Sequence, residues 1–290
     1  MELLFIFGRI LSSSFSSVFQ KQLSHHGLHP FYIVAATYFI LSLLAAPLIG
    51  LIDAPLLGGA FWINIFLASL LDVAGWMFLV ISLSKTDLSV FGPLNAYKVV
   101  ISTVLGAFFL GEIPSTQGIV GVAVIMVGSF FLTQTSAATD RSRAFGLLLE
   151  RGVQARFLSI ILFSVGTVFL KNSVLYAGAF ETLIFWSLFG LPLILLANAW
   201  FLRDRFIQSV RASYPHLHTI VMAGVLVFLM QYLTLVLLSR MLVAYALALF
   251  QLGMLLQVVL GHTLFKEGQF IRRLLAGLVM MAGSSLVLMA

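Results

Sequence analysis

One stretch of the sequence occurs twice: Val104–Ser129 reads VLGAFFLGEIPSTQGIVGVAVIMVGS, and Val259–Ser284 reads VLGHTLFKEGQFIRRLLAGLVMMAGS, at an offset of 155 residues. The identical positions include Gly106/Gly261, Glu112/Glu267 and Gly128/Gly283. Each copy predicts an apolar helix, a short turn that begins with glutamate, and a second apolar helix that carries glycines. Near the N-terminus, SVFQKQL at 17–23 resembles TVFLKNS at 167–173. The pattern indicates two copies of one half, and such a repeat determines the whole fold.

The composition is that of a membrane protein. Hydrophobic residues make up 61% of the chain and charged residues 9%, against roughly 45–50% and 25% in soluble domains. The chain has no cysteine, which excludes disulfides and thiolate metal sites. The basic residues lie in short gaps between apolar runs, as in membrane proteins, so we expect no nucleic-acid partner.

Apolar runs of about 20 residues, the length that crosses a bilayer, predict ten transmembrane helices. They fall near 3–23, 31–51, 60–83, 88–111, 116–134, 157–177, 181–202, 217–239, 243–265 and 270–289. The expected fold class is therefore an all-α integral membrane protein with two five-helix repeats, 1–134 and 157–290. A basic cytoplasmic connector, 135–156, joins them, and part of it is compatible with an interfacial amphipathic helix.

Five helices per repeat is an odd number, so the second repeat must be inverted relative to the first. Inverted repeats are frequent in secondary transporters, whose substrate site lies near the bilayer midplane between the repeats. A duplicated channel, a scaffold and an intramembrane enzyme remain alternatives.

The basic residues predict the orientation. The loops after helices 3, 5, 7 and 9 hold eleven lysines and arginines, whereas the loops after helices 2, 4, 6 and 8 hold Arg240 alone. Positive loops stay in the cytoplasm. We therefore expect a multi-pass protein of the bacterial inner membrane with periplasmic N- and C-termini.

Polar residues inside the apolar runs are the candidate pathway residues, because charged groups in a membrane are costly and need partners or a water-filled cavity. Helical spacing places Arg9, Ser13, Ser16 and Gln20 on one face of the first run. It likewise places Ser164, Thr167 and Lys171 on one face of the sixth run. We call each set a polar stripe. Serine and threonine also serve as helix-packing contacts. Lys21 either lines the cavity or extends to the membrane edge.

Asp72 and Lys98 form the most specific predicted pair. Each lies 13 residues from Lys85 in the intervening turn, hence about 20 Å from it along its helix and at matching depth. Arg9 lies at a comparable level. A carboxylate between two cations in a membrane is expected to be paired, either as a structural ion pair or as a site that exchanges partners during transport.

Four further side chains are expected to shape the pathway: Trp76, Asn95, Gln231 and Gln251. Trp76 lies one turn from Asp72 and therefore on the same helix face. His25, His26 and His29 have no second ligand cluster nearby. We therefore expect no metal and no cofactor.

The inverted ten-helix duplication, the Gly-Glu turn at Gly111-Glu112 and the glycine-rich helix after it resemble the EamA-type members of the drug/metabolite transporter superfamily. The resemblance covers nearly the whole chain, although Lys266 stands in the second copy where the first has Gly111. It implies a secondary carrier, often an exporter of amino acids, other metabolites or drugs. Members with cytoplasmic termini are familiar, in contrast to the orientation that the charges predict.

The predicted interior has an excess of positive charge. Arg9, Lys98 and Lys171, together with Lys21 if it lines the cavity, outnumber the one negative charge of Asp72. Such a cavity favours a small solute with an anionic group, for which an amino acid-like molecule is suited. A drug or nucleotide-linked metabolite carrier and a non-transporting assembly subunit are the alternatives. An intramembrane enzyme is disfavoured because no zinc or nucleophile motif occurs. Expected partners are the solute, the bilayer and, as an open alternative, a coupled proton, for a monomer or homodimer.

Overall fold

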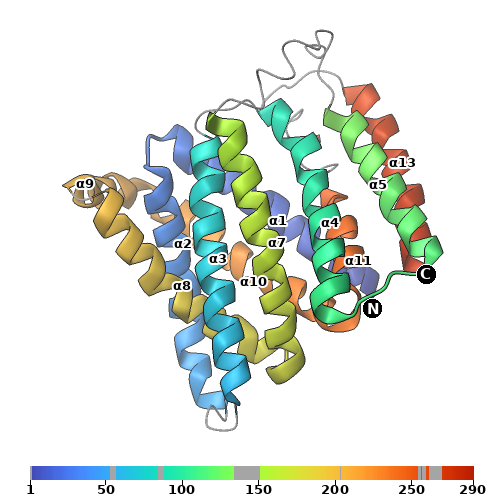
Figure 1. Cartoon of the computed structure of the whole chain (residues 1–290). Coiled ribbons are helices and arrows are strands. Elements are labelled where there is room, and N and C mark those ends of the chain that lie inside the picture. The colour runs from blue at the N-terminus through green and yellow to red at the C-terminus, as the bar shows by residue number, and fades with distance from the viewer. Residues whose placement is uncertain are drawn as a thin grey trace. The chain divides into compact units, whose positions relative to one another are not determined.

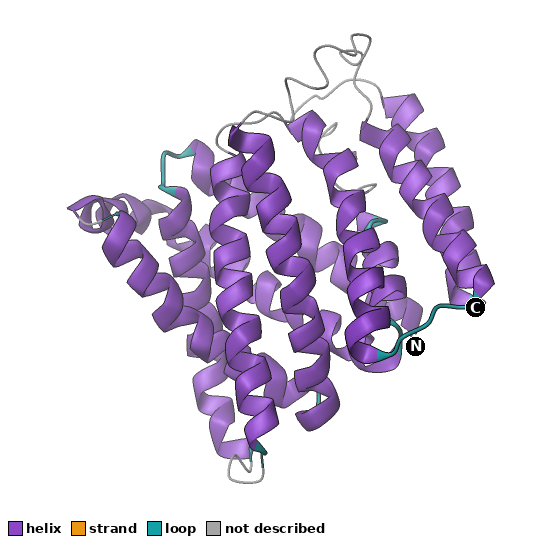
Figure 2. Ribbon diagram, in the orientation of Figure 1, coloured by secondary structure: helices purple, strands orange, loops and turns teal. Residues whose placement is uncertain are grey.

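The computed structural model describes residues 2–52, 57–83, 88–133, 151–202, 204–253, 256, 259–260 and 270–290. Over these residues the chain is helical and contains no strand (Figure 1). Figure 2 shows that the described residues outside the helices form a few loops. The predicted all-α class is confirmed.

Every predicted apolar run contains a described helix. These helices are α1 (Glu2–His25), α2 (Pro30–Ala45, continued by the 3-10 helix η1, Ala46–Leu51), α3 (Gly59–Leu83), α4 (Leu88–Leu110), α5 (Thr116–Thr133), α7 (Arg151–Ala177), α8 (Ala179–Phe201), α10 (Leu217–Arg240), α11 (Val243–Phe250) and α13 (Phe270–Leu288). Within the described ranges, six helical stretches are long and apolar enough to cross a membrane. The ten-span inverted repeat therefore stays a prediction.

Three features differ from the sequence expectation. Helix α7 already includes residues 151–156, before the predicted start near 157, because arginine, glutamine and alanine favour helix although they are not part of the apolar run. Helix α11 ends at Phe250, and Gln251 lies in a turn. The amphipathic helix α9 (Asp204–Ser213) was not predicted; most of the connector where one was considered lies outside the described residues.

The chain divides into two compact units, which are described separately. The first consists of Met1–Met77 and Phe169–Arg240, and the second of Phe78–Val168 and Met241–Ala290. In the first unit, α1 packs on α10, and α2 packs on α8 and α10. Aromatic rings join α3 to α8, with the centroids of Trp62 and Phe185 4.7 Å apart. Each unit thus takes helices from both halves of the chain.

Polar contacts fix α2 against α8 inside the first unit. The Ser42 hydroxyl donates to the carbonyl of Ser187 (3.0 Å), and the Asn198 amide donates to the carbonyl of Phe31 (3.2 Å). A hydrogen bond between buried helices satisfies groups that find no water there. These two contacts hold the two helices in register at two levels, one of them next to Trp186.

In the second unit, the Gly-Glu turn between α4 and α5 contacts the N-terminus of α11. Gly111 has a φ of +65°, a left-handed conformation that glycine adopts without steric cost. The turn brings the Glu112 carboxylate to the N-terminus of α11, where Oε2 accepts a hydrogen bond from the Val243 backbone N–H (2.7 Å). A carboxylate is stabilising at a helix N-terminus, so this repeated motif has a structural role.

The N-terminus of α2 carries a pH-sensitive cap. The Nδ1 atom of His29 accepts a hydrogen bond from the Phe31 backbone N–H (3.3 Å), which requires Nδ1 to be unprotonated. Burial, and then the positive charge of Arg205, lower the pKa of His29 below its usual value. The neutral ring is therefore the form that the fold favours.

A folded-state pKa below the unfolded value means that this contribution is present above the unfolded pKa and is lost as the pH falls through the folded pKa. We expect the melting temperature in detergent to fall on acidification below about pH 6.5. His29→Asn keeps an acceptor at the cap and should reduce that fall. All other histidines are the same in both proteins, so the difference between the two pH profiles reports His29; identical pH profiles would contradict the assignment.

Candidate functional site: a polar seam and an aromatic pocket

The predicted stripe on α1 meets one face of α10 within the first unit. The Arg9 guanidinium donates from Nε to Thr234 Oγ1 (3.4 Å). Val227, Gln231 and Thr234 follow helical spacing on α10, and Gln231 is buried. Ser16, on the α1 stripe, is buried as well. We call the row formed by Arg9, Ser13, Ser16 and Gln20 with Gln231 and Thr234 the polar seam.

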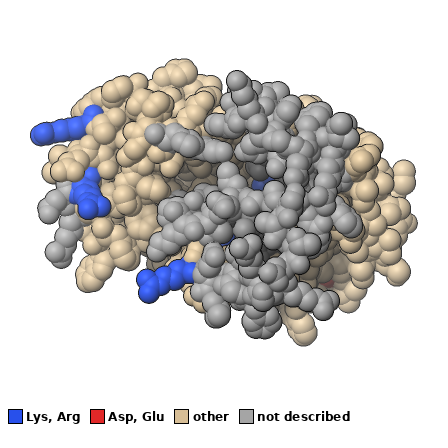
Figure 3. All heavy atoms as spheres, turned by 90° about the horizontal axis from the view of Figure 1, so that it is seen from above, with Lys and Arg blue, Asp and Glu red and all other residues tan. Residues whose placement is uncertain are grey.

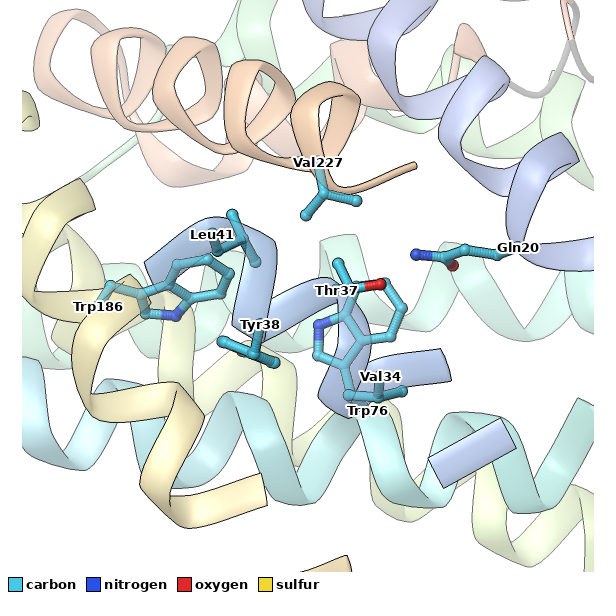
Figure 4. A pocket seen from close by; sticks show the side chains of 8 residues that line it. All are labelled: Gln20, Val34, Thr37, Tyr38, Leu41, Trp76, Trp186 and Val227. Carbon is cyan, nitrogen blue, oxygen red and sulfur yellow. The ribbon is translucent and has the colours of Figure 1, made fainter. Parts of the chain in front are cut away.

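The polar seam leads to a pocket. Gln20, at the far end of the α1 stripe, lines it, together with Val227 of α10. Gln20 lies 11 residues beyond Arg9, or about 16 Å along the helix and close to the same face. The eight lining residues come from five helices of the first unit: Gln20, Val34, Thr37, Tyr38, Leu41, Trp76, Trp186 and Val227 (Figure 4).

Aromatic rings dominate this pocket. The centroids of Tyr38 and Trp186 are 5.3 Å apart with the rings tilted by 46°, and Trp76 of α3 lines the pocket too. Space for the Tyr38 ring exists because position 190 on α8 is glycine: a Cβ there would overlap the ring. Gly190 therefore sets the position of Tyr38.

Asp72 lies directly behind the pocket wall. Its Oδ2 accepts a hydrogen bond from the Trp186 indole Nε1–H (2.9 Å), and Asp72 is 6% exposed. A buried indole N–H needs an acceptor, and an ionised carboxylate is a strong one. The bond places a negative charge one residue layer from the pocket and fixes the orientation of Trp186.

The remaining predicted site residues lie in several places. Lys171 is buried on α7 in the first unit, and Thr167 is buried one turn earlier in the second unit, where its hydroxyl donates to the carbonyl of Phe163 (2.7 Å). In the second unit, the Lys98 ammonium lies 5.1 Å from the centroid of the Phe163 ring. Gln251, also there, is buried in the turn after α11.

The side chains of two predicted site residues lie outside the part of the chain that the structure describes. Lys21 and Asn95 lie on the described helices α1 and α4, but their side chains are not among the described ones. The proposed pairing of Asp72 with Lys98 stays a prediction, because the two residues belong to different units.

Sequence reasoning missed Tyr38 and Trp186. Neither was among the predicted pathway residues, although both line the pocket and are at most 2% exposed. The sequence feature that could have identified them is a polar hydroxyl or N–H group in the middle of an apolar run. A tyrosine hydroxyl or an indole N–H usually finds a hydrogen-bond partner when it is buried.

The pocket is small in this conformation. Its cavity volume is about 10 Å³, which is room for about one water-sized group. Pockets for drug-sized ligands measure roughly 300–1,000 Å³. The space is therefore suited to a small chemical group rather than to a bulky molecule.

The helices expose their large apolar side chains outward, as a lipid-facing surface requires. Phe108 is 84% exposed, and Trp200 is 78% exposed.

Seen from above, basic side chains stand out on the side where α9 lies (Figure 3). Arg205 and Arg211 of α9 are both exposed. A basic amphipathic helix beside apolar spans is typical of the membrane–water interface.

Comparison with known proteins supports a transporter. A solved structure described as "Crystal structure of protein" matches 99% of this chain and 96% of its own, with a TM-score of 0.73 and 15% sequence identity; this likeness shows the fold. No curated protein matches the chain. The profile of the EamA-like transporter family matches residues 1–134. The resemblance inferred from the sequence is thus confirmed over residues 1–134: this chain is a multi-pass membrane protein whose residues 1–134 match the EamA-like transporter family, within the drug/metabolite transporter superfamily.

Proposed function

We propose that this protein is a secondary transporter that exports a small, amino acid-like metabolite with an anionic group. The family indicates a membrane transporter with a small-molecule substrate; export is an expectation from the resemblance. The observation that carries the charge preference is the presence of Arg9 on the polar seam and of buried Lys171 in the same unit. Cations inside membrane helices are costly and mark substrate or ion pathways by default.

The polar seam supports a route for the solute. It runs for about 16 Å along α1, from the arginine to the pocket, and serines and glutamines lie between apolar surfaces along it. These groups offer hydrogen bonds to a solute that leaves its water shell. Because the pocket is smaller than most ligand sites, passage requires a change of conformation, which we assign to alternating access between the two repeats.

The transport role predicts a selective effect of Lys171→Gln. Removal of a charge-assisted contact costs about 1.5–3 kcal/mol, or roughly tenfold to a hundredfold in affinity. In vesicles that contain the purified protein, we expect uptake of an anionic amino acid such as glutamate to weaken by that factor. The matched control is Arg240→Gln, which removes an exposed cation at the end of α10. Equal transport by wild type and Lys171→Gln would remove Lys171 from the pathway.

The inverted repeat and the charge pattern predict ten spans in a bacterial inner membrane with both termini periplasmic. A C-terminal fluorescent reporter that matures only in the cytoplasm should therefore stay dark, whereas a reporter active only in the periplasm should give a signal at the same position. The opposite result would reverse the proposed orientation without affecting the helix assignments.

A further inference from the structure

The Tyr38 hydroxyl is a buried polar group with no described partner. Tyr38 is 2% exposed and lines the pocket, and its hydroxyl has no hydrogen-bond partner among the described residues. A buried hydroxyl without a partner costs about 1–3 kcal/mol. Buried polar groups are normally satisfied, so an unsatisfied one in a pocket indicates a ligand that supplies the missing hydrogen bond.

The hydroxyl of Tyr32, six residues earlier on α2, provides the contrast. It forms a 2.7 Å hydrogen bond with the Ser213 hydroxyl. Tyr32 is buried to a similar degree, at 8% exposed. The same helix therefore carries one tyrosine hydroxyl that stabilises the fold and one that is left for another role.

The surroundings of the Tyr38 hydroxyl favour a positive group. Two indole rings and the phenol ring line the pocket, and no lysine or arginine is among its described lining residues. Aromatic faces attract cations, tryptophan most strongly. The Asp72 carboxylate bound to the Trp186 N–H adds negative charge behind the wall, which would repel an anion and attract an ammonium group.

From this geometry we infer that the pocket binds the ammonium group of the transported solute. The faces of Trp76, Trp186 and Tyr38 surround this group, and the Tyr38 hydroxyl oxygen accepts a hydrogen bond from one of its N–H groups. This inference rests on the proposed transport function and makes the solute zwitterionic. The ammonium group binds in the aromatic pocket, and the anionic group uses the cations of the pathway.

Three probes with one carbon skeleton test the charge preference: n-butylammonium, butan-1-ol and butyrate. Binding to the purified full chain is measured by calorimetry and by tryptophan fluorescence, since two of its tryptophans line the pocket. We expect n-butylammonium to bind at least about tenfold more tightly than either other probe, as a desolvated cation–π site allows. Tighter binding of butyrate or butan-1-ol, or no binding of any probe, would overturn the inference.

Tyr38→Phe and Tyr32→Phe separate binding from folding. In Tyr38→Phe, affinity for n-butylammonium should fall roughly tenfold, and the melting temperature should stay the same or rise, because the lost hydroxyl had no partner in the described structure. Tyr32→Phe should lower the melting temperature and bind the probe as wild type does. A Tyr38→Phe protein that binds normally, or that melts as Tyr32→Phe does, would contradict the inference.

A transport assay keeps this inference distinct from the proposed function. Vesicles are tested with alanine and with N-acetylalanine, which keeps the carboxylate and loses the ammonium group. We expect transport of alanine alone. Transport of both solutes would refute the ammonium site but leave the transporter intact. Selective n-butylammonium binding without transport of any amino acid would instead refute the proposed function.

Discussion

Replacement of Gly121 by leucine is expected to leave little folded protein in the membrane. Helices α5 and α13 run side by side in the second unit (Figure 1), and their backbones touch at this residue. A Cβ at position 121 would lie 2.8 Å from the Gly283 carbonyl oxygen and 2.9 Å from the Val287 nitrogen. Backbone atoms cannot rotate away as a side chain does, so the helices must separate.

The contact is reciprocal, which makes the expected cost large. A Cβ on Gly283 would lie 2.8 Å from both the Gly121 carbonyl oxygen and the Ile125 nitrogen. Small residues at such crossings allow the close packing that holds membrane helices together. Overpacking costs typically 1–3 kcal/mol and occasionally more, and a leucine here should cost about 3 kcal/mol or more.

The measurement is membrane yield together with melting temperature in detergent, for Gly121→Leu and Gly283→Leu separately. Ala123→Leu is the matched control, because Ala123 lies on the same helix and is exposed. It adds the same side chain to a lipid-facing surface and should change little. Wild-type stability of Gly121→Leu would show that α5 and α13 do not pack as described.

The sequence repeat identified glycines in these helices but not their partners. Its offset aligns Gly283 with Gly128, whereas the structure places Gly283 against Gly121. An internal repeat compares positions in equivalent copies, and it contains no information on which faces of the two copies meet. Helix existence followed from apolar length, but helix pairing depends on the three-dimensional arrangement.

The candidate site shows the same limit. The spacing of Arg9, Ser13, Ser16 and Gln20 predicted one helix face, and the structure sets that stripe against α10. The pocket at its end depends on Tyr38 and Trp186, whose types alone do not distinguish a packing residue from a pocket residue. That distinction depends on whether each polar atom finds a partner, which only the folded structure shows: Trp186 finds Asp72, and Tyr38 finds none among the described residues.

Asp72→Asn is expected to weaken transport strongly while the aromatic pocket remains in place. Asparagine keeps the size of aspartate and has a carbonyl oxygen that can accept the Trp186 N–H in place of Oδ2. The variant therefore removes the charge and preserves the contact. If Asp72 acts only as the acceptor that orients Trp186, Asp72→Asn should transport nearly as wild type does.

We expect instead that the charge itself is used, because ionisable groups inside membrane helices are functional sites by default. Loss of a charge-assisted interaction corresponds to roughly a tenfold to hundredfold loss in transport efficiency. The pH dependence of transport should also flatten if this carboxylate carries the coupled proton. Proton coupling is the open part of the proposal, and the pH profile of this variant tests it directly.

Trp186→Phe is the matched variant. It keeps the charge of Asp72 but replaces the indole with a phenyl ring, and so it removes the hydrogen bond to Asp72. It should weaken binding of n-butylammonium in the pocket but retain the pH dependence of transport, whereas Asp72→Asn should lose that dependence. Melting temperatures of both proteins must be measured, because, if Asp72 pairs with a buried cation as predicted, leaving that cation without its counter-ion costs about 3–5 kcal/mol. An Asp72→Asn protein that melts as wild type does and transports at the wild-type rate, with the same pH profile, would leave Asp72 with a structural role only.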